Sequence, residues 1–365
     1  MKSSALTLRQ LNRATLARQL LLEREKTSAL KAIGRLFAMQ AQLPRPAFIG
    51  LWSRVAGFER EELKGLLHRR DVVRGTLLRG TLHLLSAKDF LAFRDAFTPM
   101  LEKAIGTVLR ERAKGLDVAV LVPQALAYLQ AQPRTFEEVR THLSALHPKG
   151  DGRAMGFAMR CALKLVQVPI EAPWSFPPEA AFAPAEPWLG KKLSAVADLR
   201  PLVLRYLEGF GPASVADMQT WSGLKELGGP FEQLRPKLKT FLDPRGRELF
   251  DLPKAPRPAE EVDAPVRFLP DYDNLLLGHA DRTRVISDGH RALIATKNLM
   301  ILPTFLVDGF AAGTWKIDRA RAAATLTLKP FEALPKKARA ELTQEGAALL
   351  RFVEPDAGKQ VVRFG

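Results

Sequence analysis

Two glutamines, Gln40 and Gln42, are the residues whose type and spacing most directly suggest chemistry. A glutamine amide donates and accepts hydrogen bonds and carries no charge at any pH, so the pair cannot act as a strong general base. It could orient a water molecule, or stabilise charge that develops on a substrate whose leaving group is already activated. Alternatively, the two amides cap a helix or hydrogen-bond the loop that follows.

The geometry of this pair depends on the element that carries it. Apolar residues at helical spacing predict a helix over residues 28–40. Pro44 disfavours helical geometry just before it, so we expect the helix to stop near Gln42 and to run into a proline-rich, basic-aromatic turn. Side chains two residues apart on a helix point to nearly opposite sides. The glutamines are therefore expected to converge only if the chain becomes extended between them.

Positive charge is the strongest compositional feature. The 365 residues carry a formal net charge of +16, and residues 1–115 hold 22 basic and 10 acidic side chains, a balance of +12. The arginines interleave with periodic apolar positions, which favours a folded basic face over a disordered tail. Such a face suits DNA or RNA. The alternative is a solvated basic surface that binds no nucleic acid.

The first unit, residues 1–115, has the element order of a winged helix. Thr7 is expected to cap its first helix. Residues 72–86 are rich in β-forming side chains around two glycines and predict a hairpin. Helices followed by a two-stranded hairpin are typical of a winged helix, which can place a helix in a DNA groove. The predicted helices span residues 7–22, 28–40, 60–70 and 89–114.

Basic side chains on and near this hairpin are candidate DNA contacts. Arg74, Arg79 and His83 lie along it and could contact phosphates or line a binding pocket. An ordinary buried histidine is an equal alternative for His83. Arg54 follows Trp52 and could clamp a phosphate, whereas Trp52 itself is expected in the core.

Three further units are predicted. Residues 116–192 contain helical segments, one opened by a Thr135–Glu138 capping box, and predict a winged-helix-like unit. Residues 193–255 again place helices before two strands and predict a third winged helix. Residues 256–365 are rich in strands and predict a small barrel or sheet. The predicted fold class is α+β, with tandem winged-helix domains and a C-terminal β-rich, barrel-like domain.

A polar segment, residues 271–284, interrupts the apolar C-terminal part. Its Asp, Asn, His and Arg side chains resemble a metal cluster, but no two histidines have the spacing of helical ligands, so no metal site is predicted. The preferred interpretation is a salt-bridged turn, or a DNA-facing loop that carries Arg282 and Arg284.

The remaining composition excludes several protein classes. Cys161 is the single cysteine, so an intramolecular disulfide or a cysteine-based metal cluster is impossible, and the thiol is expected in the core. The N-terminus lacks the apolar core of a secretion signal, and no apolar run approaches a membrane span. We expect a cytoplasmic, nucleoid-associated monomer without a cofactor or an obligatory protein partner.

Four long motifs allow comparison with a known family. They are MQAQLPRPAFIGLWSR at residues 39–54, VVRGTLLRGTLHLLSAKDF at 72–90, RFLPDYDNLLLGHADRTRV at 267–285 and FLVDGFAAGTW at 305–315. Together they resemble the winged-helix DNA-binding family that includes interstrand-crosslink and alkylpurine DNA glycosylases of the azinomycin-resistance type. The family's catalytic motif is glutamine, an apolar residue, then glutamine or aspartate. Gln40-Ala41-Gln42 matches it in place.

The resemblance implies a monofunctional DNA glycosylase that acts on N7-alkylated purines, including bulky or crosslinked ones. Alkylation makes the base a cation that leaves without a strong acid, and Gln40 and Gln42 would hold a water under C1′ and stabilise the sugar's developing charge. The motif has no lysine for a Schiff base. The implied partner is duplex DNA with such purines, and the candidate DNA contacts are Arg45, Arg54, Arg74, Arg79, His83, Arg282 and Arg284.

Two other function classes stay open. A non-catalytic winged-helix DNA-binding protein, such as a regulator or an architectural factor, would need only the tandem winged helices and the basic face. An RNA-binding or protein-interaction module is the third class. A flat response of binding to salt would exclude every nucleic-acid function.

Overall fold

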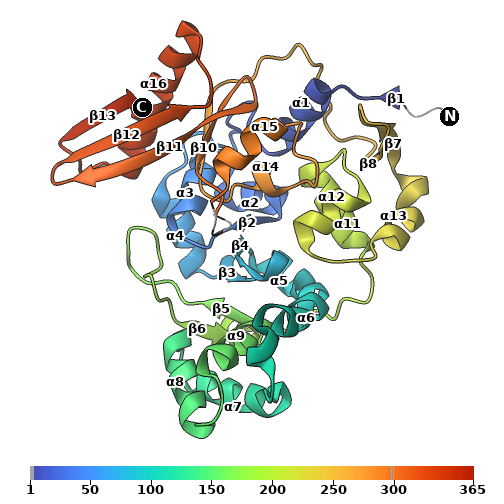
Figure 1. The fold of residues 1–365 in the computed structure, drawn as a ribbon, viewed down its shortest axis with the longest axis vertical. Helices are drawn as coiled ribbons and strands as arrows, with labels where there is room; N and C mark the ends of the chain where they lie inside the picture. The colour runs from blue at the N-terminus through green and yellow to red at the C-terminus, as the bar shows by residue number, and fades with distance from the viewer. Residues whose placement is uncertain (1–3, 297, 299) are drawn as a thin grey trace.

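The computed structural model describes residues 4–296, 298 and 300–365, and it consists of three sheets with helices around them (Figure 1). This confirms the α+β class. In the view of Figure 1, the C-terminal sheet lies at the upper left, the helices of residues 118–162 form the lower end, and residues 200–251 lie at the right. No helix in this described part is long and apolar enough to cross a membrane.

The glutamine motif lies on a strand and not at the end of a helix. Helix α2 (Ala29–Leu36) ends well before Gln40. Phe37 follows with a φ of 65°, and strand β2 (Ala38–Gln40) begins directly after it. The predicted helix to residue 40 is wrong because β2 pairs antiparallel with the neighbouring hairpin and is buried there along its whole length. This distant pairing outweighs the local helical pattern.

The proline-rich segment after the motif is a helix, which corrects the predicted turn. Helix α3 (Arg45–Trp52) has a proline in its first turn, where the missing N–H costs no intrahelical hydrogen bond. Pro44 therefore directly precedes a new helix, whereas α2 already ends at Leu36. Phe48 and Leu51 of α3 pack in one core cluster with residues of α2 and of α4 (Arg60–His68), which fixes the chain beyond the motif.

The predicted hairpin is present and forms the centre of this sheet. Strands β3 (Val72–Thr76) and β4 (Leu82–Ser86) pair antiparallel, and β4 also pairs with β2. In this register Gln40 lies opposite His83. The hairpin thus carries the motif on one of its edges.

The same sheet continues past the predicted boundary at residue 115. Its order is β2-β4-β3-β5-β6, with β5 at Leu165–Gln167 and β6 at Phe182–Pro184. Gly75 allows this contact, because a Cβ there would lie 2.9 Å from the carbonyl oxygen of Leu165. Residues 1–115 and 116–192 therefore share a sheet, and the division into four units stays a prediction.

Helices after the hairpin build the largest core. Many of their apolar side chains belong to one cluster, which includes the predicted core residue Cys161. The helices are α5 (Ala87–Phe93), α6 (Thr98–Leu109), α7 (Val118–Ala131), α8 (Phe136–Leu146), α9 (Gly152–Ala162) and α10 (Ala185–Leu189). Helix α1 (Leu8–Arg18) precedes the hairpin, and its Leu16 packs in a different cluster. The expected caps at Thr7 and at Thr135–Glu138 are both confirmed as capping boxes.

Residues 193–255 contain helices and then a hairpin, as predicted. The hairpin also pairs with the N-terminal strand, since β1 runs parallel to β7. The elements are β1 (Ser4–Ala5), α11 (Arg200–Phe210), α12 (Val215–Ser222), α13 (Gly228–Leu234), β7 (Lys239–Leu242) and β8 (Glu248–Asp251). Tandem winged-helix organisation stays a prediction.

The C-terminal strands form an open sheet, so the barrel-like prediction is wrong. The sheet has the order β13-β12-β11-β10-β9, and α16 packs against it. Residues 284–286 form turns and a bend, and Arg284 is buried. The elements are β9 (Arg267–Leu269), α14 (Asn274–Leu277), α15 (Asp288–Arg291), β10 (Thr304–Val307), β11 (Phe310–Ala320), β12 (Ala323–Pro330), α16 (Lys336–Val353) and β13 (Lys359–Phe364).

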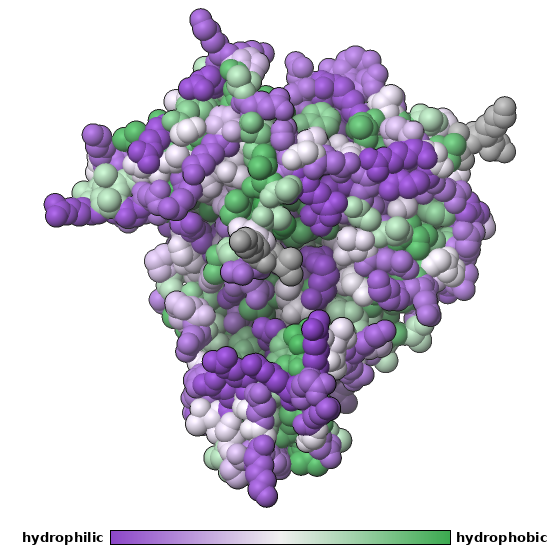
Figure 2. Space-filling model, viewed as in Figure 1, coloured by the Kyte–Doolittle hydropathy of each residue, from purple (hydrophilic) through white to green (hydrophobic). Residues whose placement is uncertain are grey.

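The surface is mostly hydrophilic. On the face that Figure 2 shows, hydrophilic residues dominate and hydrophobic residues occur in small areas between them. Exposed large apolar side chains are scattered along the chain, from Leu8 to Leu293. Scattered apolar residues of this kind are normal for a protein surface.

Candidate active site

Strand geometry gives the two glutamines the arrangement that a helix would deny them. Side chains two apart on extended chain point to the same side. The extension continues just past β2, since the Ala41 N–H donates to the Leu82 carbonyl at 2.8 Å. Gln40 is 8% exposed, whereas Gln42 is an exposed residue. The pair therefore has one enclosed amide on β2 and one exposed amide in the bend that follows it.

The fold holds the oxygen of each amide and leaves its nitrogen available. Gln40 Oε1 accepts a hydrogen bond from Arg79 Nη2 at 2.9 Å, and Gln42 Oε1 accepts one from the Leu82 backbone N–H at 3.1 Å. Within residues 4–296, 298 and 300–365, neither amide nitrogen has a hydrogen-bond partner. The alternative that the two glutamines only hydrogen-bond neighbouring protein groups thus explains the role of their oxygens. Each NH₂ group can still donate a hydrogen bond to a ligand.

Arg79 is the cation nearest the enclosed amide. It lies in the turn between β3 and β4 with a φ of 53°, and its Nη1 donates to the Trp221 carbonyl oxygen. Burial, and secondarily the nearby Arg282, lower the pKa of Arg79 to about 10. The guanidinium therefore remains charged at neutral pH and polarises the Gln40 amide through a charge-assisted hydrogen bond.

Arg74 supports the backbone of the motif from within the protein. Its Nε donates to the Ala41 carbonyl at 2.7 Å, and its Nη2 donates to the Gln42 carbonyl at 3.0 Å. The side chain is 3% exposed, and burial lowers its pKa to about 10. The structure thus places Arg74 beneath the motif, where two of its nitrogens hold the motif backbone.

Three other candidate DNA contacts are also internal. His83 is 1% exposed, its Nδ1 lies 3.0 Å from the Thr81 carbonyl oxygen, and burial is the main cause that lowers its pKa to about 3. Arg54 is enclosed and pairs with both carboxylate oxygens of Asp273 at 2.7 and 2.9 Å. Arg284 is buried and donates to the Pro212 carbonyl at 2.8 Å. In this arrangement none of the three can contact a phosphate.

Arg45, Arg79 and Arg282 are the candidate contacts that reach the surface. Arg45 is the first residue of α3, directly after the motif. Arg282 lies near Arg79, and burial lowers its pKa. These partly exposed guanidiniums stay candidate DNA contacts.

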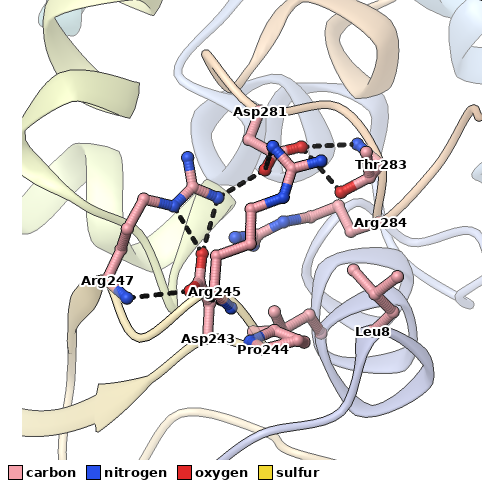
Figure 3. A pocket seen from close by; sticks show the side chains of 9 residues that line it. Leu8, Asp243, Pro244, Arg245, Arg247, Asp281, Thr283 and Arg284 are labelled. Atoms are coloured by element: carbon pink, nitrogen blue, oxygen red, sulfur yellow. Dashed lines mark hydrogen bonds and ion pairs between the residues drawn. The ribbon is translucent and has the colours of Figure 1, made fainter. Parts of the chain in front are cut away.

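The polar segment of residues 271–284 contains α14 and then, around Asp281, a salt-bridged turn. Asp281 receives hydrogen bonds from the backbone and hydroxyl of Thr283 at 2.9 and 2.6 Å. Figure 3 shows Arg245 and Arg247 reaching it from the β7–β8 turn, with Arg245 at 3.3 Å. These bonds, with the desolvation that opposes them, lower the pKa of Asp281 to about 2. The segment therefore joins the third unit to the C-terminal part.

The beginning of this segment lines a pocket beside Gln40, in line with the expected loop near a catalytic cleft, although the sequence did not single out Asp271. A small pocket beside Gln40 is lined by Met39, Gln40, Pro46, Ala47, Arg54, Pro270, Asp271, Tyr272, Asp273 and Asn274. Asn274 Nδ2 donates to the Ala38 carbonyl at 2.7 Å, two residues before Gln40. Burial raises the pKa of Asp271. The motif DYDN was visible in the sequence, but no local signal connects it with residue 40.

Comparisons with known proteins identify the class of enzyme. The sequence model of the AlkZ-like DNA glycosylases matches residues 33–352. The chain belongs to this family and is a DNA glycosylase.

A curated relative and a solved structure, both from Streptomyces sahachiroi, are similar to the chain. A curated relative, "Interstrand DNA cross-link repair glycosylase", is 26% identical over 361 residues, which cover 88% of this chain and 90% of the relative. The solved structure "Streptomyces sahachiroi DNA glycosylase AlkZ" matches with a TM-score of 0.77 at 24% identity and covers all of both chains. The structural match shows a shared fold.

Proposed function

We propose that this DNA glycosylase hydrolyses the N-glycosidic bond of N7-alkylated purines, including bulky and interstrand-crosslinked ones. The observation that carries the proposal is the pair of uncharged amides, Gln40 and Gln42, at the site. Such a pair suits a leaving group that is already activated, and a purine alkylated at N7 carries a positive charge before the bond breaks. The name of the curated relative supports crosslinks as the lesion.

The amides would act on the sugar and the water. As the bond to the base breaks, C1′ gains oxocarbenium character, as in glycoside hydrolysis. The carbonyl oxygens of Gln40 and Gln42 each keep a second lone pair, which can hold the attacking water and face the positive sugar. Arg79 fixes the Gln40 amide at 2.9 Å so that no reorientation is needed during the reaction.

The test is release of the base from defined duplexes. We would incubate the protein in excess over DNA that carries N7-methylguanine, or a nitrogen-mustard crosslink, and cleave abasic sites with alkali. We expect Gln40→Ala and Gln42→Ala to release base about 100-fold more slowly, or worse, while they still bind DNA. The matched control is Gln130→Ala, which removes an exposed glutamine of α7. Absence of scission by the wild type on both substrates would refute the proposed lesion class.

A further inference from the structure

We propose that Asp271 is a further catalytic residue, whose carboxylate accepts the proton of the attacking water and faces the positive sugar. This inference rests on the proposed function, since it assigns the base for that hydrolysis. It answers a chemical need that the motif leaves open, because an amide cannot take up a proton at neutral pH. A carboxylate is the ordinary group for both tasks in glycoside hydrolysis.

Asp271 is available for this role. It lines the pocket beside Gln40 and is partly exposed. The other carboxylate of that pocket, Asp273, uses both oxygens on Arg54 at 2.7 and 2.9 Å. Among the described residues, no ion pair and no side-chain donor engages Asp271. The pocket therefore offers one carboxylate that accepts a hydrogen bond from its own backbone N–H and still has acceptor capacity for a ligand.

The fold holds the backbone around Asp271 against the motif. Before it, Ser53 Oγ donates to the Phe268 carbonyl at 2.5 Å, and the Trp315 indole donates to the Leu269 carbonyl at 2.9 Å. After it, Asn274 donates to the Ala38 carbonyl of β2 at 2.7 Å. Tyr272 has a φ of 57°, a conformation that costs energy for a non-glycine residue. A strained position between such anchors is typical of a functional site.

The charges around the carboxylate suit a base. Burial raises the pKa of Asp271, and Arg45 of α3 partly opposes this shift. Arg54 and Asp273 also line the pocket, but they neutralise each other as an ion pair. Tyr272, on the same segment, has a pKa raised by burial and by Asp271. A raised pKa brings a carboxylate closer to neutral pH and makes it a more effective proton acceptor.

The step balances without any co-reactant. The bond between C1′ and N9 breaks, and its electron pair goes to the cationic alkylpurine, which leaves as a neutral base. The water oxygen forms the new bond to C1′. One water proton moves to the Asp271 carboxylate and is later released to solvent. The products are the free base and an abasic site.

The test compares Asp271→Asn and Asp271→Glu in single-turnover base release from N7-methylguanine DNA across pH. We expect Asp271→Asn to react about 100-fold more slowly or worse, and to bind DNA at least as well because a negative charge is removed. In the wild type the rate should rise with pH as the Asp271 carboxylate ionises. Because burial raises the pKa of Asp271, this rise should occur above the ordinary aspartate pKa of about 4. This rise should disappear in Asp271→Asn and partly return in Asp271→Glu.

The controls separate this inference from the proposed function. Asp288→Asn removes the same charge from an exposed position on α15 and should keep both the rate and the pH profile of the wild type. If the wild type releases base and Asp271→Asn stays within about threefold of it with the same pH rise, the role of Asp271 is refuted and the proposed function stands. If the wild type releases no base, both fall together. If Asp271→Asn unfolds at a lower temperature than the wild type, Asp271→Glu provides the test. A rate that depends on pH in Asp271→Glu as it does in the wild type would refute the role of Asp271.

Discussion

Among the described residues, one side chain, that of Arg79, hydrogen-bonds the Gln40 amide and so sets its orientation. Its guanidinium joins the Gln40 oxygen, at 2.9 Å, to the Trp221 carbonyl on α12. We predict that Arg79→Gln slows base release about 10- to 100-fold, since a hydrogen bond to a charged group contributes about 1.5–3 kcal/mol. Arg79 is also a candidate DNA contact, so the measurement must separate kcat from binding.

The decisive comparison for Arg79 is with Arg69→Gln. Arg69 is exposed and pairs with Asp71 next to the same hairpin, and its loss should leave the single-turnover rate at saturating enzyme unchanged. If Arg79→Gln weakens DNA binding but reacts normally once bound, Arg79 contacts the phosphates and does not orient the amide.

Patterns among neighbouring residues predicted the elements that are stabilised by contacts between neighbouring residues. The caps at Thr7 and at Thr135–Glu138 and the hairpin of residues 72–86 follow from neighbouring residues, and the structure confirms them. Strand β2 could not be predicted this way, because its three residues extend only by pairing with β4. The same holds for Asp271, which reaches the motif through contacts far along the chain.

A buried ion pair between Arg54 and Asp273 joins the residues that follow α3 to the segment after β9. Arg54 and Asp273 are 0% and 2% exposed, and removal of one partner leaves an uncompensated buried charge. We predict that Arg54→Leu and Asp273→Asn each lower the free energy of unfolding by about 3–5 kcal/mol. The double variant should lose clearly less than the sum, because it buries no unpaired charge.

Urea unfolding of the two single variants and the double variant measures this coupling. Arg69→Leu is the matched control, because its ion pair with Asp71 is exposed and should contribute less than about 1 kcal/mol. Additive losses for Arg54 and Asp273 would show that their pairing does not hold the two elements together.

Over the whole molecule, the formal charge of the sequence overestimates the number of basic side chains on the surface. Within residues 1–115, which carry most of the net charge, five arginines are buried: Arg13, Arg18, Arg54, Arg74 and Arg94. Three of them form ion pairs with carboxylates beyond residue 250, namely Asp308, Asp251 and Asp273. Composition counts these guanidiniums as surface charge, whereas the structure uses them to join distant parts of the chain. The phosphates therefore meet fewer cations than the net charge of +16 suggests.

This reduced set of cations gives a definite salt dependence for DNA binding. If about five phosphates are contacted, the affinity for duplex DNA should fall with salt with a log–log slope of about −4 to −5, far below what the net charge would allow. Arg45→Gln should flatten the slope by about 1, since Arg45 is partly exposed, begins α3 directly after the motif, and has no ion pair among the described residues. Lys337→Gln removes the same charge from α16, where the side chain is 88% exposed, and should leave the slope unchanged.

Fluorescence anisotropy with a labelled duplex at several salt concentrations measures the slopes of the wild type and of both variants. Equal flattening by both variants would mean that binding follows net charge, whereas a loss confined to Arg45→Gln would mark the surface beside Gln42 as the place where the backbone of the DNA lies.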